Sequence, residues 1–466
     1  MPRNGVNMSI YPYIARNVFL PIAEAMEGTS IHSHLKFLEK SQWWSTEELQ
    51  EYQDKSLRVL IKYAYENVPY YHTSFKETGV RPDDIKNVRD LRKLPIINKE
   101  IIRKNFDKFK SKDFIKRKPR PSCTGGSTGE PLKYFYDWDA WSMDWACNYR
   151  GFGFAGYHIG DKIVTIGGAS LVPSQKPTFK KQIKNKIIER HLMLSAFDMN
   201  KTNMNIYLKK MHNYKPKFLR GYPSALYVLA KFIENHGLHM PPIQNAFTTS
   251  ETLYDYYKKR IESIFSCKVF DNYGCRDGGG NAMECSAHNG LHISVERCVM
   301  EFIRANESVA PYETGKIILS DLQNYSFPFI RYEVGDAGVL SDEKCSCGRG
   351  LPLIKKLEGR ICDIIVTPLG KLLPSEFFPH LMLNFPFVKQ YQIIQNSIEH
   401  LTINIVLYTS KDEDKVNNIC SIIQKYIGEE MIIEANIVNK IETPSSGKRR
   451  FVISKVRPIY GCNHAK

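Results

Sequence analysis

Apolar residues recur with a helical period in the first part of the chain. Four of them lie three or four residues apart: Leu57, Leu60, Ile61 and Ala64. Ser45 and Thr46, followed by two glutamates, form a typical helix start before this run. We therefore predict helices from about residue 46 to residue 94, within a helical N-terminal region 1–118. The prolines at positions 119 and 121 end this region.

The pattern changes to alternating strands and helices between about Lys133 and Leu340. Apolar runs at 162–166 and 315–320 predict strands, and the spacing within 224–236 predicts a helix. Such alternation is typical of an α/β fold in which helices cover a sheet. We predict a large N-terminal domain, 1–359, built of layered sheets and helices.

A second, smaller pattern begins after residue 363. Segments 390–394, 401–408 and 431–437 predict strands, and 412–427 predicts a helix between the last two. About 100 residues are sufficient for an independent small domain. We predict an α+β C-terminal domain at 364–466.

Composition narrows the class of protein. The chain has 466 residues, of which 42% are apolar and 24% charged, as in an ordinary folded protein. No apolar run approaches the roughly 20 residues of a membrane span, and the N-terminus lacks the pattern of a signal peptide. Eleven cysteines in a chain of this length favour reduced thiols or a metal over a secreted disulfide framework. These features predict a cytoplasmic protein.

The net charge of +16 is concentrated in two segments. Lys86–Arg120 holds fourteen basic and four acidic residues, and Lys176–Arg190 holds six basic residues and one acidic residue. Because the remainder is nearly neutral, the charge does not indicate a nucleic-acid-binding protein. The second segment is interpreted as a surface helix with a solvated basic face. Contact with an anionic membrane is the alternative, and the aromatic and apolar stretch 11–19 is another candidate for such contact.

Five short motifs carry the candidate chemistry. The first is the glycine-rich stretch 124–132, TGGSTGEPL, whose backbone N–H groups and hydroxyls suit phosphate oxygens. It lacks the Gly-Lys-Ser/Thr ending of a P-loop. The others follow in order along the chain: YGCRD at 273–277, FIRYEVGD at 329–336, GRICD at 359–363 and PSSGKR at 444–449.

This ordered set resembles the acyl-adenylate-forming superfamily, and specifically its phenylacetate-CoA ligase-like branch, with members associated with capsular polysaccharide synthesis. The N-terminal stretch 68–71, VPYY, and the stretch 320–322, SDL, are similar to that branch. The resemblance implies a large N-terminal domain and a small domain that swivels between two reaction steps. Residues 360–363 would be the hinge, centred on Asp363.

The resemblance also implies a role for each motif. Thr124, Gly125, Gly126, Ser127, Thr128 and Gly129 would hold the ATP phosphates, with Thr128 near Mg²⁺. Tyr273 would lie near adenine and Asp277 would help to bind Mg²⁺. Asp336 would accept hydrogen bonds from the ribose, and Arg360 would lie at the nucleotide. Lys448 would neutralise charge as the carboxylate attacks phosphorus, because joining two anions requires cationic donors.

Two positions depart from the family pattern. Asp277 stands where glutamate is common, so metal contact requires a closer approach or a bridging water. Gly125 replaces a common serine, which loosens the phosphate loop while its main donors remain.

A metal site is the second prediction. Cys285, His292, Cys345 and Cys347 offer three thiolates and one imidazole, the donor set of a tetrahedral structural zinc site. Their spacing alone leaves free thiols as an equal alternative, and similar elements that bind zinc in relatives favour the metal. His288 is the competing ligand.

The predicted function is therefore an ATP-dependent, AMP-forming ligase. It would activate a small carboxylic acid as an acyl-adenylate, then transfer the acyl group to coenzyme A, a carrier thiol or an acceptor in surface-polysaccharide biosynthesis. Two alternatives are direct transfer to a sugar amine or hydroxyl, and nucleotide binding without turnover. The implied cofactors are ATP, Mg²⁺ and structural zinc. A peripheral location at the inner membrane face, against anionic lipid or a lipid-linked glycan, is a further expectation.

Overall fold

The N-terminal region of the computed structural model is helical, as predicted. The structure describes residues 10–124, 132–167, 185–196, 199–240, 242–360, 365–369, 372–373, 377–382, 384–442 and 450–456. The first helices are α1 (Ile10–Ile14), the π-helical η1 (Ala15–Phe19), α2 (Leu20–Glu27), α3 (Ile31–Ser41), α4 (Thr46–Asn67) and α5 (Pro69–Thr78). Short turns follow: η2 (Pro82–Asp84), η3 (Val88–Lys93), α6 (Lys99–Lys104), η4 (Phe106–Phe109) and α7 (Phe114–Arg117).

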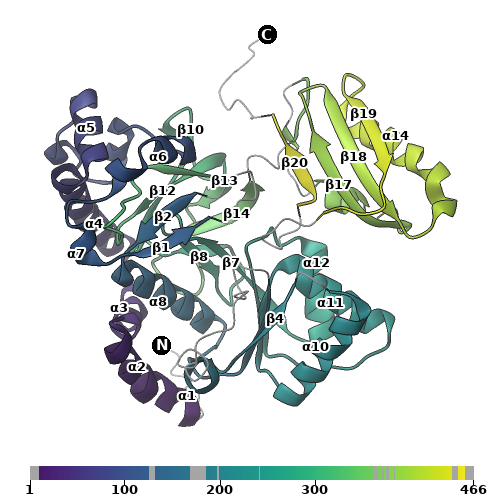
Figure 1. The fold of residues 1–466 in the computed structure, drawn as a ribbon, viewed down its shortest axis with the longest axis horizontal. Helices are drawn as coiled ribbons and strands as arrows, with labels where there is room; N and C mark the ends of the chain where they lie inside the picture. The colour runs from purple at the N-terminus through teal and green to yellow at the C-terminus, as the bar shows by residue number, and fades with distance from the viewer. Residues whose placement is uncertain are drawn as a thin grey trace.

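Helix α4 begins where the sequence predicted. The Ser45 side chain accepts a hydrogen bond from the Glu48 amide, and the Glu48 carboxylate accepts one from the Ser45 amide. This reciprocal capping satisfies two amides that a helix start leaves without partners. The apolar face of α4 then packs, with α5, in one cluster with the strand residues Ile317 and Leu319. The helices therefore cover the antiparallel half of the main sheet (Figure 1).

One mixed sheet of twelve strands forms the centre of the large domain, in the order β11-β10-β12-β13-β14-β9-β8-β7-β6-β5-β3-β4. Its strands are β3 (Ile163–Gly167), β4 (His191–Ser195), β5 (Phe218–Gly221), β6 (Asn245–Thr249), β7 (Lys268–Cys275), β8 (Gly280–Glu284), β9 (Leu291–Ile293), β10 (Cys298–Arg304), β11 (Glu307–Ser308), β12 (Thr314–Asp321), β13 (Tyr332–Ser341) and β14 (Leu353–Arg360). Strands β4, β3, β5, β6 and β7 are parallel, whereas the pairs from β7 to β11 are antiparallel. The runs predicted at 162–166 and 315–320 are strands β3 and β12.

Helices cover the parallel half of this sheet. They are α8 (Trp138–Phe154), α10 (Lys201–Tyr214), α11 (Pro223–Asn235) and α12 (Asp255–Phe265), with the π-helical η5 (Asn185–Glu189) before β4. Residues of α10, α11 and α12 share one buried cluster with β3, β5 and β6. Beside the sheet, β1 (Arg120–Cys123) and β2 (Lys133–Tyr136) form a hairpin. The predicted α/β fold class is confirmed.

A second sheet of four strands follows near the C-terminus, in the order β19-β18-β17-β20. Its strands are β17 (Val388–Gln395), β18 (His400–Leu407), β19 (Ile432–Ile437) and β20 (Val452–Ser454). Helix α14 (Val416–Ile427), preceded by the 3-10 turn η7 (Ser410–Lys415), shares a separate buried cluster with this sheet. The smaller elements are β15 (Ile365–Val366), β16 (Leu372–Leu373) and α13 (Phe377–Met382). Three predicted strands and the predicted helix are confirmed here, and β20 was not predicted.

Among the described residues, no helix combines the length and the apolar composition that crossing a bilayer requires.

Candidate active site and metal centre

Two of the predicted motifs are joined by a crossed pair of tyrosine–aspartate hydrogen bonds. The Tyr273 hydroxyl, near the end of β7, donates to Oδ2 of Asp336 on β13 at 2.9 Å. The Tyr332 hydroxyl, at the start of β13, donates to Oδ2 of Asp277 at 3.0 Å. Each tyrosine thus orients the aspartate of the other motif. Burial raises the pKa of both phenols well above 10, so both remain protonated donors at neutral pH.

The turn after β7 fixes the backbone beside Asp277. The Cys275 thiol donates to Oδ1 of Asp277 at 3.4 Å. Gly278 and Gly279 follow with φ of +105° and +76°, and a Cβ on Gly279 would lie 2.7 Å from Cγ of Asp321. The buried Arg297 donates from Nε to the Gly279 carbonyl at 2.8 Å. Glycine is therefore required at this turn for both its conformation and its space.

Asp336 and Arg360 are brought together by the register of the sheet. They are Cα partners in the antiparallel pair of β13 and β14. The structure describes only the backbone of Arg360. Two motifs 24 positions apart in the sequence therefore meet at one edge of the site.

A cavity of about 430 Å³ opens beside these residues. Tyr273, Asp336 and Gly359 contribute to its wall, and so do Arg450 and Val452 from the segment that forms β20. The cavity thus lies between the large sheet and the C-terminal sheet (Figure 1). A cavity between two lobes is a common location for small-molecule sites.

The loop that follows β6 also borders this cavity. Thr248 and Thr249 end strand β6, and Ser250 and Glu251 line the cavity wall. The Glu251 carboxylate accepts a hydrogen bond from the Ser224 amide at the start of α11. This contact positions the loop against the helix.

A charged group that was not predicted from the sequence lies on another part of the wall. Lys258 Nζ lies 3.2 Å from Oε1 of Glu284, and His288 Nδ1 lies 2.9 Å from the same oxygen. Asp271, also on the wall, has its pKa raised to about 6 by burial, although Thr248 donates to it. These residues come from α12, β7, β8 and the turn after β8, so no local pattern in the sequence could have grouped them.

The predicted phosphate loop is described only at its base. The Thr124 amide donates to the Leu132 carbonyl, and the Leu132 amide donates to Oγ1 of Thr124, both at 2.9 Å. These bonds close the β1–β2 hairpin on either side of the loop. Gly125, Gly126, Ser127, Thr128 and Gly129 lie outside the described residues, as do Asp363 and Lys448.

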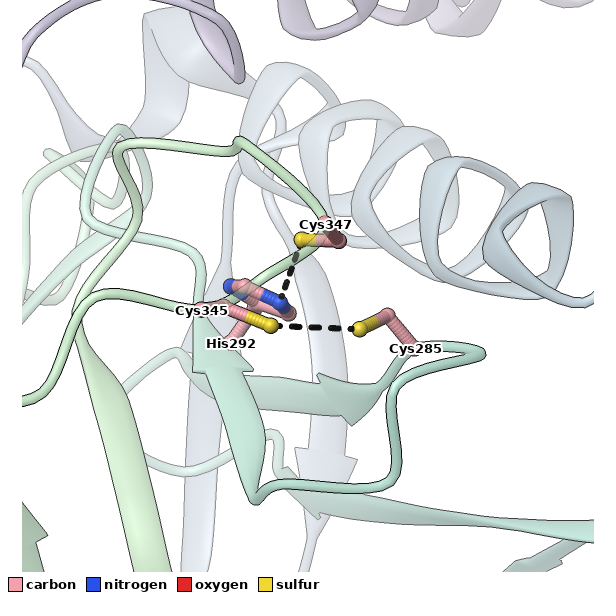
Figure 2. A group of neighbouring side chains, drawn as sticks. All are labelled: Cys285, His292, Cys345 and Cys347. Carbon is pink, nitrogen blue, oxygen red and sulfur yellow. Dashed lines mark hydrogen bonds between the residues drawn. The ribbon is translucent and has the colours of Figure 1, made fainter.

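The four predicted zinc ligands form one cluster (Figure 2). Cys285 Sγ lies 3.6 Å from Cys345 Sγ, and Cys347 Sγ lies 3.4 Å from His292 Nε2. All four ligand atoms lie within 4.8 Å of one another. Around a tetrahedral zinc ion, S···S and S···N separations are about 3.8 and 3.6 Å, as follows from its bond lengths. The donor set therefore fits zinc with little rearrangement. His288, paired with Glu284, lies outside the cluster.

The surroundings of the cluster set the protonation of its ligands. His292 Nδ1 lies 3.3 Å from the Leu351 carbonyl, which favours the proton on Nδ1 and leaves Nε2 as the ligand atom. Burial lowers the pKa of His292 to about 4, which keeps the ring neutral. Burial raises the pKa of Cys285 to about 12. Burial also acts to raise the pKa of Cys347, but hydrogen bonds from Arg349 outweigh it and lower that pKa.

Comparisons with known proteins find similarity to CapK, to phenylacetate-coenzyme A ligases and to the fold of an acyl-CoA ligase. Protein CapK of Staphylococcus aureus is 28% identical over 434 residues, covering 88% of this chain and 90% of that protein. A phenylacetate-coenzyme A ligase of Pseudomonas putida is 24% identical over 359 residues, covering 75% and 79%. The structure of 2-hydroxyisobutyryl-CoA ligase in the postadenylation state, in complex with R3-HIB-AMP, shares the fold, with a TM-score of 0.69, 16% identity and coverage of 90% and 92%.

The chain is a homologue of CapK and of phenylacetate-coenzyme A ligases, and it shares its fold with acyl-CoA ligases of the acyl-adenylate-forming superfamily. More specifically, it is similar in sequence to CapK and to phenylacetate-coenzyme A ligases, and its residues 365–455 match the model of the CapK C-terminal domain. The family interpretation made from the motifs is thereby confirmed, together with the enzyme class of AMP-forming ligases.

Proposed function

We propose that this protein is an ATP-dependent ligase that activates a carboxylic acid as its acyl-adenylate and then transfers the acyl group. The observation that carries the proposal is the crossed pair of hydrogen bonds, Tyr273 to Asp336 and Tyr332 to Asp277, beside a cavity between two lobes. This pair holds two carboxylates in fixed positions. Homology to phenylacetate-CoA ligases over three quarters of the chain supports the same function.

Each carboxylate has a role that follows from its position. Asp336 would accept hydrogen bonds from the ribose hydroxyls, because it lies on the cavity wall beside Tyr273. Asp277 and Thr128 would hold Mg²⁺, which supplies positive charge to the phosphates when it is bound. The loop from Thr124 to Gly129 would surround the phosphate oxygens, and Arg360 would lie against the nucleotide.

The reaction has two steps. In the first, a carboxylate oxygen of the substrate attacks the α-phosphorus of ATP, and the bond between the α-phosphorus and its bridging oxygen to the β-phosphorus breaks. Pyrophosphate leaves with that oxygen, and Lys448 would offset the negative charge that accumulates. In the second step a thiol, amine or hydroxyl attacks the acyl carbon. The carbonyl–oxygen bond to AMP breaks, and the acceptor proton passes to solvent.

For the acceptor we propose a thiol, either coenzyme A or a carrier pantetheine. The similarity to phenylacetate-coenzyme A ligases supports a thiol. The similarity to CapK supports a role in surface-polysaccharide biosynthesis, in which the acyl group reaches a sugar amine or hydroxyl. Acyl-CoA as the sole product, with no transfer to any sugar acceptor, would exclude direct transfer to the sugar.

We further propose that residues 360–363 are a hinge between a large domain, 1–359, and a small domain, 364–466. The separate buried cluster around β17, β18 and α14 supports an independent small domain. A hinge at Asp363 predicts that Asp363→Pro, which restricts the backbone, impairs one of the two half-reactions more than the other.

The cluster of Cys285, His292, Cys345 and Cys347 is proposed to hold one structural zinc ion. The cluster connects the turn after β8 with the loop between β13 and β14, and its residues lie outside the cavity wall. Elemental analysis should find about one zinc per chain. Cys345→Ser should lower both the zinc content and the melting temperature, whereas Cys420→Ser, a matched thiol outside the cluster, should change neither. Protein without zinc whose melting temperature is unaffected by added zinc would contradict the assignment.

The exchange of labelled pyrophosphate into ATP tests the ligase function itself. Exchange should depend on an added carboxylic acid, and a panel of aryl, fatty and amino acids should include at least one active member. Nucleotide binding measured by calorimetry, with no exchange for any acid, would support the alternative of a binding protein without turnover.

A further inference from the structure

The N-terminal helix presents an apolar face to solvent. Segments α1, η1 and α2 run without interruption from Ile10 to Glu27, because the residues at both junctions have right-handed helical φ and ψ. Eight residues of this helix are exposed, and six of them are apolar: Ile10, Tyr13, Val18, Ile22, Ala25 and Met26. The exposed fractions of Ile10, Ile22 and Met26 are 78%, 57% and 73%. Surface helices normally show the opposite arrangement.

The π-helical turn aligns these apolar residues on one side. Ile10 and Val18 are eight residues apart, which in a regular α-helix would rotate Val18 by about 80° from Ile10. A π turn takes up about one more residue than an α turn, so one turn of each kind spans about eight residues. Ile22 and Met26 follow at four-residue intervals, and each lies about 40° further round the helix on the exposed side. The exposed apolar stripe therefore depends on η1.

Two charged residues of the helix, Arg16 and Glu24, face the protein body. Arg16 pairs with Glu39 of α3 at 2.5 Å, and the buried Glu24 accepts a hydrogen bond from the His32 amide. Leu20 enters the cluster formed with α3 and α8. At Gly160 a Cβ would lie 2.7 Å from Cβ of Ala15, so the helix lies tightly against the body. The helix is thus held in place by its polar residues, and the stripe is a fixed feature of the surface.

A basic side chain, that of Arg190, adjoins the stripe. The Tyr11 hydroxyl donates to the Ile187 carbonyl at 2.7 Å, and the Arg190 guanidinium lies 4.4 Å from the centroid of the Tyr11 ring. Ile187 is itself exposed and adds to the apolar surface. In the sequence, Lys176–Arg190 holds six basic residues and one acidic residue. In Figure 1, α1 and α2 lie at the outer margin of the molecule, away from the C-terminal sheet.

We propose that the stripe formed by Ile10, Tyr13, Val18, Ile22 and Met26 binds the surface of an anionic lipid bilayer. Apolar side chains on one face of a helix insert at the boundary between headgroups and acyl chains, and neighbouring basic residues attract anionic lipids. Charge favours this occupant over a second copy, since two chains of net charge +16 would repel each other. The surface is separate from the proposed active site, so it is independent of the ligase function.

Sedimentation with vesicles tests the proposal. The full-length protein should bind vesicles of phosphatidylcholine mixed with phosphatidylglycerol more strongly than phosphatidylcholine alone, and the difference should shrink at high salt. The double variant Ile22→Glu with Met26→Glu should reduce partitioning by at least about tenfold, because charges replace inserting side chains. The matched control Ile206→Glu with Ile432→Glu carries the same change in charge at exposed positions elsewhere, and should bind like the unaltered protein.

Three outcomes would overturn the proposal. The first is absence of binding to the anionic vesicles at low salt, and the second is equal loss of binding in both double variants. The third is a dimer of the unaltered protein that Ile22→Glu with Met26→Glu converts to a monomer, which would identify the stripe as a contact between copies. Acyl-adenylate formation without lipid should be the same in all variants, so failure of the lipid proposal is distinguishable from failure of the ligase function.

Discussion

The hydrogen bond from Tyr273 to Asp336 gives the most direct test of the nucleotide site. Tyr273→Phe removes one hydroxyl and retains the ring, so packing against the sheet is preserved. The lost bond is 2.9 Å long and is made to a carboxylate, an interaction worth about 1.5–3 kcal/mol. If Asp336 binds the ribose, misplacing its carboxylate should weaken ATP affinity by about 10- to 100-fold at most, since about 1.4 kcal/mol corresponds to a factor of ten.

Isothermal titration calorimetry with ATP measures this effect. Because burial raises the pKa of Tyr273, the phenol donates throughout the neutral range, and the loss should not vary between about pH 6 and 9. Tyr312→Phe is the matched control: its hydroxyl donates to Asp342 at 2.8 Å on the surface, outside the cavity wall. Its affinity should stay within about twofold of the unaltered protein. Tyr273→Phe within the same limit would refute the role assigned to Asp336.

Three further predictions follow from the same geometry. Tyr332→Phe removes the hydrogen bond that positions Oδ2 of Asp277. The Mg²⁺ concentration for half-maximal pyrophosphate exchange should therefore rise several-fold. An unchanged Mg²⁺ dependence would show that Asp277 does not bind the metal. Gly279→Ala places a Cβ against Asp321 at a positive φ and should lower the free energy of unfolding, measured by urea titration, by about 1–3 kcal/mol. Gly237→Ala, also at a positive φ but with open space around it, should lower the free energy of unfolding by less. Burial raises the pKa of Asp271 to about 6, so the folded state binds the proton more tightly than the unfolded state. The free energy of unfolding should therefore fall as the pH rises from about 4 to 6. Asp271→Asn should remove this pH dependence, and an unaltered pH dependence of the melting temperature would show that another group causes it.

Much of the secondary structure could be predicted because it depends on local periodicity. The start of α4 at Ser45, the strands β17, β18 and β19, and helix α14 all lie within a few residues of their predicted positions. Strand β20 was missed because it has only three residues and follows a long connection. The π turn η1 was also missed, since the sequence within it does not differ from an α-helical pattern.

The candidate site was only partly predictable. The four residues in Figure 2 could be predicted to form one cluster from their side-chain types and spacing, because a metal site requires particular side chains. The crossed pairing of Tyr273 with Asp336 and of Tyr332 with Asp277 could not be predicted, since it depends on how β7 and β13 are placed in one sheet. The group formed by Lys258, Glu284 and His288 was missed for the same reason.

Pyrophosphate exchange in the Lys448→Ala variant tests the central claim most directly. The unaltered protein should exchange labelled pyrophosphate into ATP when a suitable carboxylic acid is present, because formation of the acyl-adenylate is reversible. The variant should bind ATP yet lose at least about a hundredfold in exchange rate, since a cation at the developing charge contributes several kcal/mol to the transition state. Exchange at an undiminished rate in Lys448→Ala, or its absence from the folded, unaltered protein across a broad panel of acids, would contradict the assignment as an acyl-adenylate-forming ligase.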